Sequence, residues 1–304
     1  LVATDLGFAV GPRLNAAGRL DDMTVGIRCL LENDPQRALA LAAELDDLNR
    51  ERRSIEQSMK DDAMRALSHL QLDSSQVPAG LCLYDPSWHQ GVVGILASRI
   101  KEQFHRPVIA FAEADDHEIK GSARSIPGLH MRDTLDLIAK RHPKMLSKFG
   151  GHAMAAGLSL AKTDFEDFSA AFVDAVAEQL SDDQLEAVVH SDGELSPAEL
   201  SLTNAELLRS AGPWGQAFPE PLFHGRFVLQ QQRIVGERHL KMTLAPIGDS
   251  QAIIDAIAFN VDTAIWPDPA VAEVELVYKL DSNLWRERLS LQLLVEHLQP
   301  ASGV

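Results

Sequence analysis

The chain has 304 residues, 45% of them hydrophobic, so it is long enough and apolar enough to bury the cores of two domains. A formal net charge of −16 argues against a general nucleic-acid-binding surface, since phosphate contacts require Lys and Arg. No apolar run approaches the roughly 20 residues of a membrane helix, and no signal peptide is visible. The two cysteines, Cys29 and Cys82, are far apart in apolar surroundings, which predicts reduced thiols and a cytoplasmic protein.

One long helix is predicted after a short N-terminal segment. Residues 1–33 contain the sequence GPRLNAAGRLDD and a short helix near 25–31. Asp34 and Pro35 then form a strong helix start. Apolar residues at three- and four-residue spacing, with highly charged other faces, indicate a long connecting helix within the segment 34–76. A coiled-coil dimer seam is the alternative.

Residues 77–183 show alternating strand and helix signals, following a polar linker at 71–79. The pattern predicts an α/β domain with a mixed sheet. Strands are expected at 81–84, 107–112, 118–124 and 154–160, and helices at 91–103, 131–141 and 164–180.

Residues 184–304 have a different character. After a short helix near 204–209, residues 222–297 are mostly β, with alternation of apolar and charged side chains from Glu273 to Leu280. Short strands separated by Gly and Pro turns predict a small barrel of the OB-fold type. The expected fold class is therefore α/β plus all-β: a long connecting helix, a domain with a mixed sheet, and a small barrel.

The run FGGHAMAAG, from Phe149 to Gly157, is the most informative motif. Two adjacent glycines, Gly150 and Gly151, let the backbone approach a ligand closely or adopt positive φ. His152 beside them can donate to an anion or lie against a base. For this motif alone, a glycine turn beside a chance histidine is the alternative.

Two further motifs offer groups that suit a phosphate. The segment GSARS supplies Ser122, Arg124 and Ser125 after a β-rich run. His89 follows an apolar strand and opens a helix, so the backbone N–H groups at 91–92 are expected to form an anion site. Each motif alone is a weak signal.

Charge is unevenly distributed along the chain. Between Lys120 and His152 there are seven Lys and Arg residues and two Asp residues, which predicts a local basic groove on an acidic body. Solvated helix faces are the alternative. The nearby run Asp115-Asp116-His117 lies between two expected strands and lacks partner carboxylates in the sequence. It is predicted to be a polar turn and not a metal site.

A barrel that binds single strands stacks bases on aromatic side chains and follows the phosphates with basic ones. Phe223 and Phe227 are expected to be buried and not stacked. The aromatic and basic candidates in the barrel are Trp214, Phe223, Arg226, Phe227, Arg233, Arg238, His239, Lys241, Trp285, Arg286 and Arg288.

In this order, the motifs resemble the C-terminal part of the RecJ family, single-strand-specific exonucleases of the DHH phosphoesterase superfamily. The resemblance spans nearly the whole chain and rests on GPRLNAAGRLDD, WHQGVVGILASRIKEQFHRPVIAF, GSARSIPG, KFGGHAMAAGLSL and GPWGQAFPEPLFHGRF. The family usually has His-Pro-Gly where this chain has His89-Gln90-Gly91, and Gln is tolerated in a first helical turn. The Asp- and His-rich metal motifs of the family's N-terminal domain do not occur in this sequence.

The resemblance implies a DHHA1-type substrate-binding domain at 77–183, an OB-fold-like nucleic-acid-binding domain at 184–304 and the end of the catalytic core at 1–33. The parent protein would be a metal-dependent 5′-to-3′ single-stranded-DNA exonuclease of DNA repair and recombination. Its Mn²⁺ or Mg²⁺ would lie in the absent N-terminal DHH domain. This chain would then carry no catalytic residues and no metal ligands, and it would be inactive by itself.

The resemblance also implies which residues bind the strand, although Arg13 and Asn15 could equally brace a domain junction. The expected substrate-binding residues are Arg13, Asn15, Arg19, His89, Ser122, Arg124, Ser125, Gly150, Gly151, His152, Arg226, Lys241 and Arg286. The expected partners are single-stranded DNA and the single-stranded-DNA-binding protein, with no membrane. Two alternatives are a phosphodiesterase for oligonucleotides or cyclic dinucleotides, against which residues 212–297 argue, and a non-catalytic module that docks a protein partner through residues 190–304.

Overall fold

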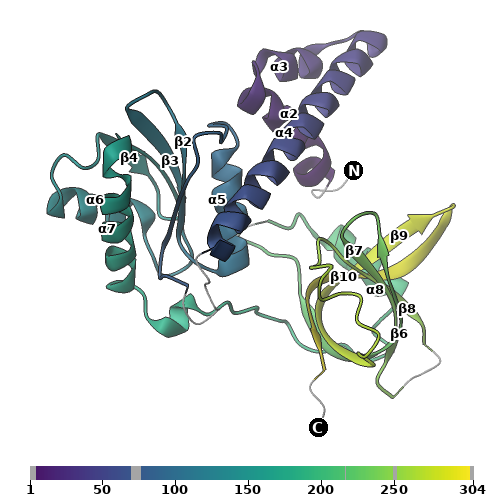
Figure 1. Ribbon diagram of the computed structural model, residues 1–304. Coiled ribbons are helices and arrows are strands. Elements are labelled where there is room, and N and C mark those ends of the chain that lie inside the picture. Colours follow the sequence, from purple (N-terminus) through teal and green to yellow (C-terminus); the bar gives the residue numbers. More distant parts are fainter. Residues whose placement is uncertain (1–4, 70–76, 216, 249–251, 302–304) are drawn as a thin grey trace. The chain divides into compact units, whose positions relative to one another are not determined.

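A computed structural model describes residues 5–69, 77–215, 217–248 and 252–301, so most of the predicted linker at 71–79 lies outside the described residues. The chain forms two compact units (Figure 1). One runs from Ala9 to Ala187, and the other includes Val188 and the residues that follow it.

The N-terminal part is helical. Its elements are η1 (Leu6–Val10), α2 (Gly11–Leu20), α3 (Thr24–Leu31) and α4 (Pro35–His69). α4 has 35 residues and confirms the predicted long helix. It starts as expected, because the Asp34 carboxylate accepts a hydrogen bond from the backbone N–H of Arg37 at 2.9 Å. α2 packs on α4, and its small residues Ala16 and Ala17 are completely buried.

A five-stranded mixed sheet follows, in the order β1-β2-β3-β5-β4, with β1 and β2 parallel and the other neighbours antiparallel. The strands are β1 (Leu81–Tyr84), β2 (Val108–Glu113), β3 (Glu118–Arg124), β4 (Lys148–Gly151) and β5 (Ala155–Ala161). The α-helices are α5 (Val93–Phe104), α6 (Met131–Arg141) and α7 (Phe165–Ala177). Two short 3₁₀ helices, η3 (Lys162–Asp164) and η4 (Asp182–Leu185), are also present. Every predicted strand and helix of this domain is present. β4 was not predicted: its glycines were expected in a loop.

Helices cover both faces of this sheet. Along β2, Ile109 and Phe111 pack into one core with α6 and α7, while Val108, Ala110 and Ala112 pack into another with α4 and α5. Figure 1 shows α5 on one side of the sheet and α6 and α7 on the other. α5 contacts β2 and β3, so it covers only part of its face.

The second unit is a closed barrel with the strand order β10-β8-β7-β6-β9. A short helix precedes it, α8 (Leu202–Ala211), and the strands are β6 (Phe223–Val235), β7 (His239–Pro246), β8 (Ile254–Ala258), β9 (Glu273–Trp285) and β10 (Arg288–Pro300). β8 and β10 pair in parallel, and the other neighbours are antiparallel. A five-stranded closed barrel of this kind is the predicted OB-type fold.

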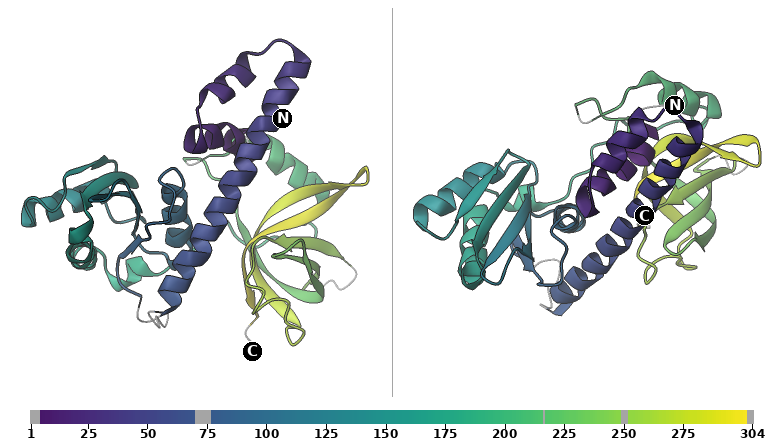
Figure 2. Two further views of the ribbon diagram at one scale, coloured as in Figure 1. Left: turned by 45° about the horizontal axis from the view of Figure 1, so that its top comes forward. Right: turned by 90° about the horizontal axis from the view of Figure 1, so that it is seen from above.

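The barrel interior is filled by alternate side chains of its strands. Tyr278 is completely buried and packs edge-on against Phe227 and at a tilt against Phe223. Phe227 is buried and Phe223 is half-buried in this core, so the prediction that neither is a stacking platform is confirmed. Figure 2 shows the β9–β10 hairpin extending beyond the rest of the barrel.

Candidate nucleic-acid interface

An open groove of about 460 Å³ lies on the sheet face that α5 covers only in part. We call it the sheet groove; it is lined by Gln90, Val93, Lys120, Gly121, Ser122, Lys148, Phe149, Gly150, Gly157, Leu158 and Ser159. Three strands and the segment before α5 therefore build one concave surface.

The strand register arranges the groove floor in rows. Lys120 on β3 pairs with Ser159 on β5, which pairs with Lys148 on β4. One step along, Ser122 pairs with Gly157, and Gly157 pairs with Gly150. The first row places the Ser159 hydroxyl between the ammonium groups of the two lysines. In the second row two of the three residues are glycines, so few side-chain atoms stand above the sheet there. A polar backbone can approach this floor closely.

Arg124 continues the same face of β3 as Lys120 and Ser122, since side chains two residues apart share a face. Its Nε donates to the Ser98 hydroxyl at 3.2 Å, and its Nη1 donates to the Ala123 carbonyl at 2.8 Å. A Cβ added at Gly94 would lie 2.8 Å from Nη2, so glycine at this position leaves room for the guanidinium. The guanidinium is thus held in place by neutral partners.

The electrostatics at Arg124 favour an anion. Burial lowers the pKa of Arg124 from its usual value, and the neighbouring Arg19 cation lowers it further. A guanidinium stays protonated in proteins, so two cations are held near one another. A phosphate would relieve their repulsion and replace the water lost on burial.

Arg19 reaches this area because the end of α2 packs against the segment before α5. Its Nη1 donates to the Gly91 carbonyl at 3.1 Å. A Cβ at Gly91 would lie 2.1 Å from the Arg19 carbonyl oxygen, so glycine is needed for this close approach. The sequence predicted both segments as binding motifs but not that they contact each other.

The expected anion site on the N–H groups at 91–92 is wrong. The Gly91 N–H donates to Nδ1 of His89 at 3.0 Å, and the Val92 N–H donates to the His89 carbonyl at 3.0 Å. Both N–H groups are used within the turn that leads into α5. Gln90, where the family usually has Pro, donates from Nε2 to the Glu113 carbonyl at 2.7 Å and lines the sheet groove.

Gly151 and His152 form the tight connection between β4 and β5. Gly151 has a φ of +148°, and a Cβ there would lie 2.4 Å from the Ala155 carbonyl oxygen. The His152 N–H donates to that same carbonyl at 2.8 Å. The His152 side chain is exposed, but it does not line the sheet groove.

Of three other predicted residues, two have partners within the fold and one is exposed. Ser125 is 1% exposed and its hydroxyl donates to the Leu129 carbonyl at 2.8 Å, so it is not available to a phosphate. Arg13 forms an ion pair with Asp46 of α4 at 2.8 Å, which makes it a brace between α2 and α4. Asn15 is exposed on α2.

The basic stretch from Lys120 to His152 does not form one groove. Arg132, Lys140 and Arg141 belong to α6, which packs on the opposite face of the sheet. Lys140 pairs with Asp136 at 2.6 Å, and Arg141 pairs with Glu178 at 2.8 Å. Of the basic residues in the stretch, only Lys120 on β3 and Lys148 on β4 line the sheet groove, because side chains that are close in sequence need not share a face.

The Asp115-Asp116-His117 run is a turn, as predicted. Asp115 accepts hydrogen bonds from the N–H groups of His117 and Glu118 at 2.9 and 2.8 Å, and these bonds hold the pKa of its carboxyl below the usual range. Within the described parts of the chain, no group of three or more His, Cys, Asp or Glu residues could hold a metal ion. No described helix is long and apolar enough to cross a bilayer.

A second groove, of about 560 Å³, lies on the barrel beside the β9–β10 hairpin. We call it the hairpin groove; it is lined by Arg233, Val235, Lys241, Asp255, Asn283, Trp285, Arg288 and Ser290. Lys241 forms an ion pair with Asp255 at 2.9 Å. This surface carries four of the predicted barrel residues: Arg233, Lys241, Trp285 and Arg288. Arg286 lies at the hairpin turn, over the Trp285 ring.

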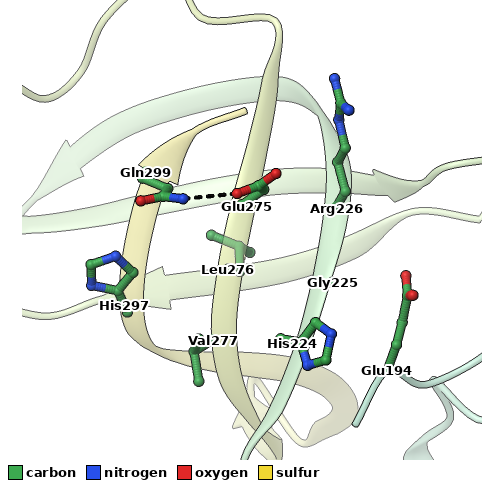
Figure 3. Close-up of a pocket in the computed structure, with 9 residues that line it drawn as sticks. All are labelled: Glu194, His224, Gly225, Arg226, Glu275, Leu276, Val277, His297 and Gln299. Atoms are coloured by element: carbon green, nitrogen blue, oxygen red, sulfur yellow. Dashed lines mark hydrogen bonds between the residues drawn. The ribbon is translucent and has the colours of Figure 1, made fainter. Parts of the chain in front are cut away.

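Arg226 does not join that group. It lines a different pocket of about 250 Å³, on the outer face of β6, β9 and β10 (Figure 3). Its Nε pairs with Glu273 at 2.8 Å, and the same pocket is lined by the carboxylates of Glu194 and Glu275. Glu275 in turn accepts a hydrogen bond from Gln299. This acidic face is poorly suited to phosphate.

Lys148, Gly157 and Ser159 line the sheet groove but were not singled out as binding residues. Lys120 was counted only as part of the basic stretch. Lys120, Ser122 and Arg124 are each two residues apart on a predicted strand, so the sequence could have predicted that they share a face. The sequence could not predict that β4 contributes to the groove, because the pairing of β4 with β5 depends on tertiary contacts.

Two family models match this chain. The DHHA1 domain model covers residues 77–179, and the RecJ OB domain model covers residues 191–297. The sheet groove lies within the first match and the hairpin groove within the second. The chain therefore joins a DHHA1 domain to an OB domain.

Similarity to curated and solved proteins extends over the whole chain. The single-stranded-DNA-specific exonuclease RecJ of Dickeya dadantii is 60% identical over 99% of this chain and 52% of its own length. The RecJ of Escherichia coli is 57% identical with the same coverage. The crystal structure of Thermus thermophilus RecJ with Mn²⁺ matches all of this chain and 42% of its own, with a TM-score of 0.75 and 29% identity. The chain belongs to the RecJ family, corresponds to its C-terminal part and spans about half the length of its curated relatives.

Proposed function

We propose that this chain is the substrate-binding part of a 5′-to-3′ single-stranded-DNA exonuclease that acts in DNA repair and recombination. Family membership supports the reaction class, since the curated relatives are named as single-stranded-DNA-specific exonucleases. The sheet groove supports the binding role, because it offers cationic and hydroxyl groups over a floor of glycines.

The observation that carries the proposal is the shared face of β3 and β4. Lys120, Ser122 and Arg124 alternate along β3, and Lys148 and Gly150 lie two strands away on the same face. Within the described residues, neither lysine has an ion-pair partner within 4.0 Å, so both can meet phosphates. Such a row of donors follows the backbone of a strand and does not read its sequence.

The roles of individual residues follow from this geometry. Arg124 and Ser122 hold a phosphate near the 5′ end, and Arg19 adds a second guanidinium to the same phosphate. His152 contacts the terminal nucleotide over the glycine floor. In the OB domain, Lys241 and Arg286 contact the strand.

A divalent metal belongs to the proposed reaction of the whole protein. Thermus thermophilus RecJ has been solved with Mg²⁺ and with Mn²⁺. The described residues of this chain do not fit such an ion, because no cluster of His, Cys, Asp and Glu could hold it. We propose that Mn²⁺ or Mg²⁺ is held by the part of the parent protein that this chain does not include.

Binding measurements with Arg124→Ala test the proposed role of the β3 face that lines the sheet groove and continues to Arg124. The chain should bind a 5′-phosphorylated single strand more tightly than the matching duplex, and the substitution should weaken single-strand binding about tenfold. A tenfold loss is about 1.4 kcal/mol, close to the low end of the roughly 1.5–3 kcal/mol of one charge-assisted hydrogen bond. Fluorescence anisotropy at fixed, moderate salt measures both affinities.

Arg132→Ala is the matched control, because Arg132 is an exposed arginine on α6, across the sheet. It removes the same charge and should leave affinity within about twofold. Equal losses in both variants would show that only net charge matters and would contradict the groove. A wild-type chain that binds neither strand nor duplex would contradict the proposed function.

A protein partner is the second candidate for the OB domain, on the observation that the hairpin groove is basic. An acidic peptide, such as the acidic tail of a single-stranded-DNA-binding protein, carries the same sign of charge as a strand. Salt dependence would not separate the two ligands. Direct competition between an oligonucleotide and an acidic peptide would.

A further inference from the structure

Trp285 differs from the other tryptophans of the described chain in its exposure. Trp88 and Trp266 are each 6% exposed, and Trp214 is half-buried with its indole N–H bonded to the Leu208 carbonyl. Trp285 is 68% exposed and lines the hairpin groove. A large aromatic ring left in solvent at a groove is a typical feature of a ligand contact.

The hairpin holds this ring in a defined place. Arg286 and Glu287 have φ values of 49° and 64° and form the two-residue turn between β9 and β10. Trp285 is paired across the hairpin with Arg288. The Arg286 guanidinium lies over the indole, 5.8 Å from the ring centroid, so a cation supports the ring from one side.

The charges around Trp285 are not balanced within the barrel. Arg233 on β6 lies directly opposite Lys241 on β7, and two like charges in this arrangement disfavour strand pairing. Asp255 is the one acidic side chain among the described residues that line the groove, and it already pairs with Lys241. Arg233 and Arg288 therefore remain for an anionic ligand.

From this arrangement we infer that Trp285 stacks on an unpaired base and thereby selects single strands at the OB domain. The inference rests on the proposed function and deepens it. Arg233 and Arg288 hold the flanking phosphates, while the indole face not covered by Arg286 takes the base. In a duplex each base is stacked and paired, so its face is not available to the indole.

Strands with and without bases test this role of Trp285. The full chain is titrated with an oligothymidylate and with an abasic strand of equal length. Wild type should bind the oligothymidylate about tenfold more tightly, and Trp285→Ala should remove that difference without changing abasic binding. Trp285→Phe should keep most of it. Oligothymidylate should also quench the tryptophan fluorescence of wild type but not of Trp285→Phe.

Leu284→Ala is the matched control, because Leu284 is 67% exposed and lies on the opposite face of the same hairpin. It should bind both strands like wild type. Equal loss for both strands in Trp285→Ala, or no loss, would overturn the inference while the proposed function stands. The inference would also be overturned if Trp285→Ala weakened the binding of an acidic peptide but not the binding of the oligothymidylate. If wild type bound neither strand, the proposed function would fail as well.

Discussion

Gly150 and Gly151 are neighbours on β4, yet a side chain would meet different surroundings at each. A Cβ at Gly150 would have nothing within 4 Å, whereas a Cβ at Gly151 would lie 2.5 Å from the Ala156 Cα. Gly151 also has a positive φ of 148°. Gly150 keeps the groove floor low, while Gly151 is required for the turn into β5.

Gly151→Ala is therefore expected to lower the free energy of unfolding of the DHHA1 domain by about 2 kcal/mol, since both strain and overlap are introduced. Thermal unfolding followed by circular dichroism measures the change. Gly150→Ala is the control and should change stability by less than about 0.5 kcal/mol. A lower melting temperature for Gly150→Ala than for Gly151→Ala would contradict this assignment.

At the residue scale, the sequence predicted which functional groups are present better than it predicted which of them are exposed to a ligand. Ser122 and Ser125 belong to one motif and have the same hydroxyl, but Ser125 is turned inward to bond the Leu129 carbonyl. Arg226 and Lys241 were both expected to bind the strand, but they lie on different faces of the barrel. Which side of a barrel a strand residue faces depends on closure and on β-bulges, which local sequence does not reveal.

At the element scale, α5 acts on the sheet groove through a glycine. Gly94 is buried on the helix surface that meets β3, where the Arg124 guanidinium and the Ser122 hydroxyl lie. A Cβ there would be 2.8 Å from Arg124 Nη2 and 3.2 Å from Ser122 Oγ. The helix thus leaves room for both groups that we propose to bind phosphate.

Gly94→Ala should weaken binding of a 5′-phosphorylated strand without lowering the melting temperature. Alanine is favoured over glycine in a helix by about 1 kcal/mol, which offsets the cost of moving the end of a flexible arginine. The double variant Gly94→Ala/Arg124→Ala should bind no more weakly than Arg124→Ala alone. Additive losses in anisotropy titrations would show that Gly94 acts by another route.

The long elements were predictable because their signals are local. α4 has a capping acid, a proline at its first turn and apolar spacing, and β9 alternates from Glu273 to Leu280. β4 was missed because KFGG has no alternation and its two glycines favour a loop. Its existence depends on pairing with β5, including Gly150 with Gly157.

At the scale of the whole molecule, a net charge of −16 leaves few surfaces that suit a polyanion, and the two basic grooves are such surfaces. The uneven charge predicted a basic groove between Lys120 and His152, and Lys120 and Lys148 of that stretch line the sheet groove. The basic residues of α6 share a sequence segment with those of β3 and β4, yet the sheet separates them. Position in three dimensions decides which cations act together.

Replacing Lys120 and Lys148 by Gln together should reduce the salt dependence of single-strand binding. If each ammonium neutralises one phosphate, the slope of log affinity against log salt should become less negative by about 1.4. Lys140→Gln is the control, because Lys140 is already paired with Asp136 and lies on α6. A slope unchanged in the double variant would show that the strand does not follow this floor.

The OB barrel has a basic groove on one face and an acidic pocket on another. Arg233, Lys241 and Arg288 line the first, while Glu194 and Glu275 line the second. Such a separation gives the barrel an electric dipole, so an approaching polyanion exerts a torque on it before contact. The barrel is therefore expected to meet a strand already turned with the Trp285 side foremost, and the acidic face shortens the search by rejecting the wrong orientation.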